Sequence, residues 1–438
     1  MSPVFNNYVL KILCVLLMTC AFVNSVFATQ ADNKTLAEAW NASQFYFNLR
    51  YRYEHVDDDF QIDRKPLKSA NASTLRTVAG YRSGDFHGFS TILELEQISR
   101  IFSGSFSDGT GATGSGVATV ADPDGTELNQ GYLRYQGLAS NDLRLGRQAI
   151  TYRDAPYHRH IGTILWRQNW QTFDAISIEN TWLPNTKIDY AYVWKVNRIF
   201  GRSAPEPLSY FSSDSHLLNL QNNQRQWAQV EAYSYLLEFN NAPRFSSQTY
   251  GIRLHGSHSL NNWFSPLYTA EYAYQSDYNS NSNNYTASYQ LFEAGFRLVS
   301  FNYLDNLELK LGFERLSGDG SPNGAFVTIL GTNHAFQGTA DRFLVTPDDG
   351  IRDYHLRTGV DVGEFKFKLG YHMLRSDNMD YQYGKELDLE LTRQFGKHLS
   401  IGLKYAYYDG DSNTLNLMRN PILAADVTKA WFYTVVNF

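Results

Sequence analysis

Apolar and polar residues alternate along short stretches of this chain, and the last twelve residues show the pattern clearly. One side of an extended 427–438 segment carries Ala430, Phe432, Thr434, Val436 and Phe438. The other side carries Lys429, Trp431, Tyr433, Val435 and Asn437. Successive side chains of a β-strand leave opposite faces of the pleat, so this period of two predicts a strand. The chain ends on an aromatic residue inside that strand.

The same alternation recurs along the whole chain and predicts an all-β fold. Seventeen stretches show it: 44–54, 73–82, 86–96, 128–136, 143–150, 172–182, 187–199, 227–238, 249–257, 267–277, 287–300, 307–316, 352–361, 365–375, 385–393, 400–408 and 427–438. Helical periodicity is almost missing, apart from one turn expected at 36–40. Tight turns are expected at 303–306, 362–365 and 395–398.

An odd number of strands conflicts with a closed barrel whose two ends lie on the same side of a membrane, which needs an even number. The positions of the tight turns require one more strand between 201 and 226, and 215–221 is the best candidate. We therefore predict a transmembrane antiparallel β-barrel of about 18 strands over 44–438, with short periplasmic turns and long outer loops. The outer loops are expected at 56–72, 100–127, 151–171, 200–214, 317–351 and 409–426.

Composition supports a membrane barrel. Aromatic residues make up 15% of the chain, and the mean hydropathy is −0.40. No apolar run beyond residue 28 approaches the length of a membrane helix. A polar average with apolar residues at alternate positions suits a cylinder with lipid outside and water inside.

The first 28 residues have the pattern of a signal peptide. Lys11 precedes an apolar run at 12–23, and small residues allow cleavage after Ala28. Residues 29–43 would then be a short periplasmic lead-in, and the mature protein would lie in the outer membrane of a Gram-negative bacterium. Both cysteines, Cys14 and Cys20, fall in the leader, which excludes disulfides and cysteine metal ligands from the mature chain. A lipoprotein acceptor at Cys20 is disfavoured by Thr19 before it.

Charged residues fall mainly on the phase of the strands that faces the lumen. On the outer phase, an Arg or Lys at the bilayer midplane costs about 2–4 kcal/mol. The inward residues considered for a solute pathway are Arg50, Arg52, Arg76, Arg134, Arg144, Arg253, Arg297 and Glu94. Gly146 breaks the alternation, and a β-bulge there would also bring Arg147 to the lumen. Such residues either pair across strands as part of the wall or line a constriction for an anionic solute.

Two neighbouring segments form the densest motif, LRLGRQ at 143–148 and WRQNWQTFDA at 166–175. Together with 49–54, 75–77, 127–135, 214–219, 333–343 and 350–353, this motif set resembles the alginate-export family of bacterial outer-membrane porins. The resemblance implies an 18-stranded barrel with an electropositive conduit for a polyuronate, and it adds Arg167, Arg352 and Asp174 to the candidate conduit residues. The closing strand likewise resembles those of outer-membrane barrels, where a terminal Phe such as Phe438 is part of the signal read by the barrel assembly machinery.

The leading hypothesis is a passive channel for anionic saccharides such as alginate or related uronate polymers or oligomers, surrounded by outer-membrane lipid and lipopolysaccharide. An uptake porin for small nutrients is one alternative. A barrel hydrolase using the acidic residues at 386–390 is another, although these alternate on one strand without a companion acid/base motif, so we expect no enzyme and no catalytic residue. The net charge of −6 argues against nucleic acid. No cofactor or metal is expected, because Asp154, His158 and His160 are better explained as a solvated loop.

Overall fold

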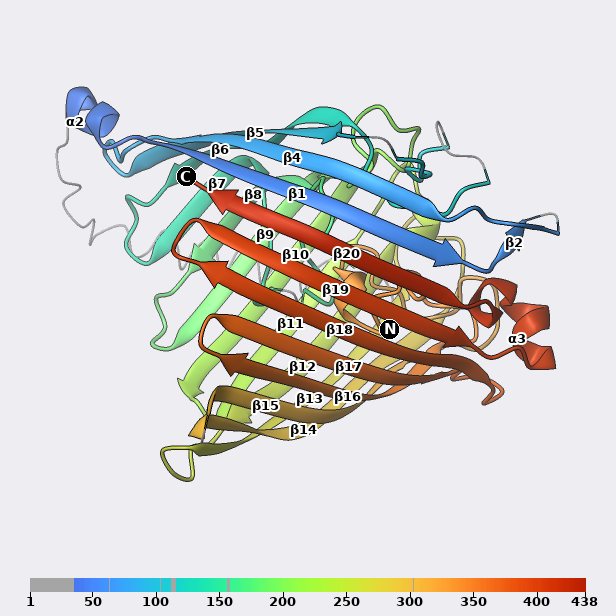
Figure 1. The fold of residues 1–438 in the computed structure, drawn as a ribbon. Coiled ribbons are helices and arrows are strands. Elements are labelled where there is room, and N and C mark those ends of the chain that lie inside the picture. The colour runs from blue at the N-terminus through green and yellow to red at the C-terminus, as the bar shows by residue number, and fades with distance from the viewer. Residues whose placement is uncertain (1–34, 63, 103, 112–115, 156–157, 302) are drawn as a thin grey trace.

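The computed structural model describes residues 35–62, 64–102, 104–111, 116–155, 158–301 and 303–438, which form one closed antiparallel barrel (Figure 1). The predicted signal peptide lies outside the described residues. A single helical turn, α2 (Leu36–Asn41), precedes the barrel as predicted. Its N-terminus is capped by Thr35, whose side chain accepts from the backbone of Glu38 while the Glu38 side chain accepts from the backbone of Thr35.

Eighteen strands make the wall of the barrel. They are β1 (Gln44–Asp58), β4 (Ala70–Arg82), β5 (Phe89–Arg100), β6 (Gly125–Tyr135), β7 (Asn141–Gln148), β8 (Thr172–Asn180), β9 (Thr186–Asn197), β10 (Tyr210–Arg225), β11 (Ala228–Leu237), β12 (Ser247–Ser257), β13 (Phe264–Asp277), β14 (Thr286–Phe301), β15 (Leu304–Leu316), β16 (Ile351–Val362), β17 (Phe365–Arg375), β18 (Gln382–Phe395), β19 (Leu399–Gly410) and β20 (Val427–Asn437). All seventeen strands predicted by alternation are present. The eighteenth, predicted at 215–221, is the middle of the 16-residue β10.

Each strand pairs with its neighbour in sequence, and β1 pairs with β20 to close the cylinder. At the seam, the Phe438 N–H donates to the Phe47 carbonyl at 2.9 Å, and the Phe47 N–H donates back to Phe438 at 3.3 Å. Among the described residues, every barrel strand is paired on both sides, which is the condition for placing strands in lipid. The short turns lie at the end that carries α2 and the C-terminus, and the longer connections lie at the other end (Figure 1).

The outer face of the barrel is apolar. Leu93 is 50% exposed on β5, Ile252 55% on β12 and Leu403 52% on β19, and charged residues alternate with them on the inner face. Such a belt is unfavourable in water but suits the hydrocarbon of a bilayer. No helix in the described part of the chain is long and apolar enough to cross a membrane.

Several connections carry short elements of their own. These are the hairpin β2 (Gln61–Ile62) and β3 (Lys65–Pro66), the turns η2 (Pro243–Phe245), η3 (Asn333–Ala335) and η4 (Pro421–Ala424), and the helix α3 (Thr414–Arg419). The loops after β7 and β15 do not stay at the outer rim. They fold into the lumen, where Ile161, Phe326 and Leu330 pack with apolar residues of the inner wall in one core cluster.

Candidate solute pathway

The two infolded loops are joined to each other inside the barrel. Ile161 and Leu330 form a parallel bridge. The Gly162 N–H donates to the Leu330 carbonyl at 2.9 Å, and the Thr332 N–H donates to the His158 carbonyl at 2.8 Å. We call the described parts of 152–171 and 324–343 the crossbar, because they form one unit across the lumen. His158 and His160, expected in a solvated loop, are buried here, so that expectation is wrong.

Basic residues of the crossbar bind an acidic wall formed by β11, β13 and β15. Arg153 lies 2.9 Å from Glu231 and 2.7 Å from Glu271. Arg159 lies 3.0 Å from Glu314. The three carboxylates are 3% exposed or less. Because a buried carboxylate is costly without a partner, the wall and the crossbar need each other's charges.

Arginines of β1 hold the other side of the crossbar by its carbonyl groups. Arg50 donates to the Leu165 carbonyl at 2.7 Å, to the Arg167 carbonyl, and to the Gln168 side chain at 2.8 Å. Arg52 donates to the Trp166 carbonyl at 2.5 Å and pairs with Asp122. These two predicted conduit residues therefore anchor an infolded loop.

Two other predicted residues are also committed to crossbar contacts. Arg76 pairs with Glu96 at 2.9 Å and lies over the Trp170 ring at 4.3 Å. Arg167, itself part of the crossbar, bridges Glu54 at 3.3 Å and Asp341 at 3.0 Å. Through Arg167, the first loop is tied both to the β1 wall and to the second loop.

The second loop is fixed through His334. Its Nδ1 lies 2.6 Å from Asp341 and its Nε2 lies 2.7 Å from the Lys404 ammonium. A carboxylate only accepts and an ammonium only donates, so the imidazole is neutral with its proton on Nδ1. Burial, reinforced by the charge of Lys404, lowers the pKa of His334 to about 4. The ring also stacks on Trp166, with the centroids 4.3 Å apart.

The acidic residues considered for hydrolysis bind the crossbar too. The Ala340 N–H donates to Glu386 at 2.6 Å, and the Thr339 N–H donates to Asp388 at 3.2 Å. Among the predicted pathway residues, Glu94 accepts from Tyr46 at 2.7 Å. These contacts therefore assign the carboxylates to stabilising the interior of the barrel.

A second group of predicted residues faces the lumen and pairs with carboxylates of the wall. Arg134 and Arg144 are opposite each other in the register of β6 and β7. Both bind one carboxylate, Asp142, at 2.7 Å, and each side chain is about one-third exposed. Arg144 also lines a cavity of about 110 Å³.

Two further arginines on the lumen side lie next to carboxylates. Arg297 pairs with Glu308 at 2.7 Å. Arg253 is 3.6 Å from Glu231 and 3.7 Å from Glu271, so it adds positive charge to the acidic wall. These contacts match the expectation of cross-strand pairing within the wall.

Three predicted residues lie on the outward-facing side of the strands: Arg147, Asp174 and Arg352. The register of β7 runs through Gly146 without a bulge, so the predicted bulge is wrong. Alternation then places Arg147, which pairs with Asp174 at 2.7 Å, on the same face as the exposed Leu145. Arg352 shares the phase of the exposed Tyr354 and binds Asp380 at 2.7 Å. Both arginines sit near the outer ends of their strands, where charged pairs can reach water and headgroups.

Two sets of inward residues were not predicted from the sequence. Glu231 and Glu314, which receive the crossbar, carried a signal in their phase, since both fall on the polar side of strongly alternating strands. A histidine pair, His355 and His372, was also missed. The predicted turn at 362–365 fixes the hairpin register that places these two residues opposite each other.

The comparisons with known proteins concern the fold. Protein-family models give no match to the sequence, and neither do the curated proteins. Solved structures are similar over most of their length. Pseudomonas aeruginosa OccK9 (OpdG) has a TM-score of 0.69 and 13% identity, and the match covers 91% of this chain and 99% of that chain. Acinetobacter baumannii OccAB2 has a TM-score of 0.67 and 15% identity, with the same coverages.

A third similar structure, Pseudomonas aeruginosa OpdK with vanillate, has a TM-score of 0.64 and 13% identity, covering 90% of this chain and 98% of that chain. These proteins are outer-membrane porins of the Occ/Opd group. The chain therefore has the 18-stranded fold of these porins, in agreement with the predicted fold. The similarity does not single out the alginate-export family.

Proposed function

We propose that the protein is an outer-membrane channel for small anionic solutes, with the crossbar limiting solute size. The observation that carries this proposal is the pair Arg134 and Arg144, which share the single carboxylate of Asp142 at 2.7 Å. Two guanidinium groups against one acid give this cluster one excess positive charge, and the neighbouring Lys187 lies 3.9 Å from Glu179 and 3.3 Å from Asp189. A guanidinium fork suits carboxylate groups.

The crossbar changes the charge balance of the lumen in the same direction. Its Arg153 and Arg159 neutralise the acidic wall. On the opposite side, Arg50 donates to the neutral Gln168 side chain and to two backbone carbonyls. Because these acceptors carry no charge, the positive charge of Arg50 adds to that of Arg134 and Arg144 in favouring anions.

Small solutes are favoured over a polymer for a physical reason. A uronate chain would have to pass a lumen crossed by two loops that are tied to the wall by buried ion pairs. One structural neighbour was determined with vanillate, a small carboxylate. The polyuronate conduit implied by the sequence resemblance remains the alternative, and it requires the crossbar to leave the lumen.

Ion selectivity tests the electrostatic part of the proposal. The mature protein is inserted into planar bilayers, and the reversal potential is measured across a KCl gradient. The wild type is expected to prefer Cl⁻, and Arg134→Gln with Arg144→Gln is expected to lower this preference. Arg352→Gln is the matched control, because Arg352 lies on the outer phase. Equal selectivity of the double variant and the wild type would contradict the proposal.

Solute size tests the crossbar part. Proteoliposome swelling is measured with uronate monomers, dimers and longer oligomers. We expect the rate to fall steeply beyond the smallest members of the series. Rates that stay constant up to long oligomers would favour the polymer conduit instead.

A further inference from the structure

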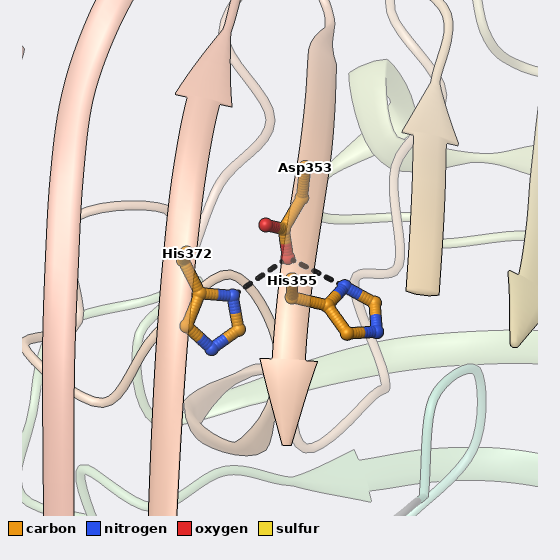
Figure 2. Close-up of side chains that lie close together, drawn as sticks. All are labelled: Asp353, His355 and His372. Atoms are coloured by element: carbon orange, nitrogen blue, oxygen red, sulfur yellow. Dashed lines mark hydrogen bonds and ion pairs between the residues drawn. The ribbon is translucent and has the colours of Figure 1, made fainter. Parts of the chain in front are cut away.

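Two histidines and one aspartate meet on the inner wall of the barrel. Asp353 and His355 alternate on β16, and His372 lies on β17 directly opposite His355 (Figure 2). The Asp353 Oδ2 is 2.8 Å from the His372 Nδ1 and 3.3 Å from the His355 Nδ1. All three residues are at most 4% exposed. Both rings turn their Nδ1 edge toward the same carboxylate (Figure 2).

The spacing of these atoms is close to that of metal ligands. One ligand atom from each residue lies within 4.8 Å of the others. Tetrahedral ligands with metal bonds of about 2.0–2.1 Å stand roughly 3.3–3.5 Å apart. The separations of 2.8 and 3.3 Å from Asp353 Oδ2 need to widen only slightly to admit an ion.

The far side of each ring gives an independent indication. The His355 Nε2 lies 3.3 Å from Glu293, and the His372 Nε2 lies 3.7 Å from Asp388. When a cation replaces the proton at Nδ1, the carboxylate at Nε2 holds the remaining ring proton there. Metal-bound histidines usually have such a carboxylate or carbonyl partner on the nitrogen that does not bind the metal.

The Asp353 carboxylate also has an unused acceptor. Its Oδ1 is buried and has no hydrogen-bond partner among the described residues. A buried acceptor without a partner costs free energy. A cation on this carboxylate would supply a partner and would offset the charge of the surrounding acids.

The wall makes room for the rings. Gly312 on β15 is opposite His355, and a Cβ on Gly312 would fall 2.1 Å from the His355 Nε2. A side chain at this position would therefore displace the imidazole. The absence of a Cβ allows His355 to lie flat against the wall beside Asp353.

We propose that Asp353, His355 and His372 form a binding site for one borderline divalent metal ion such as Zn²⁺, Ni²⁺ or Cu²⁺. Imidazole nitrogens suit these ions, whereas Mg²⁺ and Ca²⁺ prefer oxygen ligands only. Two nitrogens and one carboxylate oxygen supply three ligands, and water completes the coordination. The site belongs to the inner wall and does not depend on which solute the channel conducts.

Metal binding to the purified protein tests the proposal. The untagged mature chain in detergent is treated with EDTA, and binding of Zn²⁺ and Co²⁺ is measured by elemental analysis and by the visible spectrum of Co²⁺. We expect one ion per chain and much weaker binding of Mg²⁺. His355→Gln and His372→Gln should each weaken binding by at least ~100-fold, the upper end of the effect of altering a residue behind a metal ligand.

A matched control and a fold check keep the result interpretable. His216→Gln should leave binding unchanged, because His216 lies on β10 and contacts Tyr190 at 2.8 Å. Heat-modifiable mobility on a gel reports whether each variant forms a barrel. If a histidine variant does not fold, Asp353→Asn and Gly312→Ala replace it and should weaken binding as well. Substoichiometric binding to the wild type, or binding that persists in the folded variants, would overturn the proposal.

Discussion

Glu271 on β13 is the residue whose charge should matter most for seating the crossbar. It accepts hydrogen bonds from Arg153 at 2.7 Å, from Tyr233 at 2.7 Å and from His160 at 3.1 Å, and it is 2% exposed. Glu271→Gln keeps the shape of the side chain and removes the charge. Breaking one partner of a buried ion pair costs about 3–5 kcal/mol.

The lower end of that range applies here, because Arg153 retains Glu231 at 2.9 Å. About 3 kcal/mol corresponds to a change of roughly 150-fold in the ratio of unseated to seated loop. The barrel itself should survive, since the loss concerns a contact between the wall and a loop. The expected effect is therefore local release of the crossbar.

Thiol labelling can measure this release. Thr163 is buried in the crossbar, and both native cysteines lie in the predicted leader, so Thr163→Cys provides a single reporter. Its rate of maleimide labelling in the folded protein should rise by about 100-fold or more when Glu271→Gln is added. Glu308→Gln is the control, because Glu308 pairs with Arg297 and Lys310 on the wall.

A labelling rate in the Glu271→Gln variant within a few-fold of the parent rate would show that the charge of Glu271 does not hold the crossbar in place. A double-mutant cycle with Arg153→Met separates the pair from other effects. If Arg153 and Glu271 act together, the second substitution should add less than the first. Fully additive effects would mean that the two residues stabilise the loop independently.

Two further outcomes are expected from the same contacts. Because the pKa of His334 is lowered to about 4, a released loop binds a proton between about pH 6.5 and 4 that the seated loop does not. The free energy that holds the crossbar against the wall should therefore fall by up to about 3 kcal/mol as the pH drops through this window. Above the window, His334 should not affect it. Channel current noise should rise on acidification in the wild type, and it should rise less in His334→Gln. Deletion of Phe438 removes two seam hydrogen bonds, each contributing about 0.5–1.5 kcal/mol, and should lower the yield of folded barrel in membranes while the conductance of the folded fraction stays normal.

The strands could be predicted because a membrane barrel imposes one simple rule on every strand. Alternation identified β12, β16 and β17 nearly to the residue, since each has lipid on one face and the lumen on the other. β10 gave only a weak signal. Its register shifts between Ser212 and Ser215 and again between Asn222 and Arg225, and these irregularities break the period of two at the two ends of the strand that the pattern missed.

The infolding of the loops could not be predicted in the same way. It depends on contacts between distant residues, such as Arg153 with Glu231 and Arg167 with Asp341, and no local pattern encodes them. A loop rich in Arg, His and Trp looks like a solvated or ligand-binding loop when its acidic partners are unknown. The same residues become a buried anchor once the acidic wall faces them.

Whether a predicted arginine faces the lumen or the outside depends on its depth in the membrane and on its position in the alternating pattern of its strand. Near the middle of the wall, an inward phase is enforced by the cost of charge in lipid, and Arg50, Arg76 and Arg253 follow it. At the outer ends of the strands this cost falls, so Arg147 and Arg352 can occupy the outer phase. A match to a sequence motif predicts which residue occupies a position, but it does not give the depth of that residue in the membrane. Selectivity must therefore be sought among the inward arginines whose charge the crossbar does not use, and Arg134 with Arg144 is one pair that meets this condition.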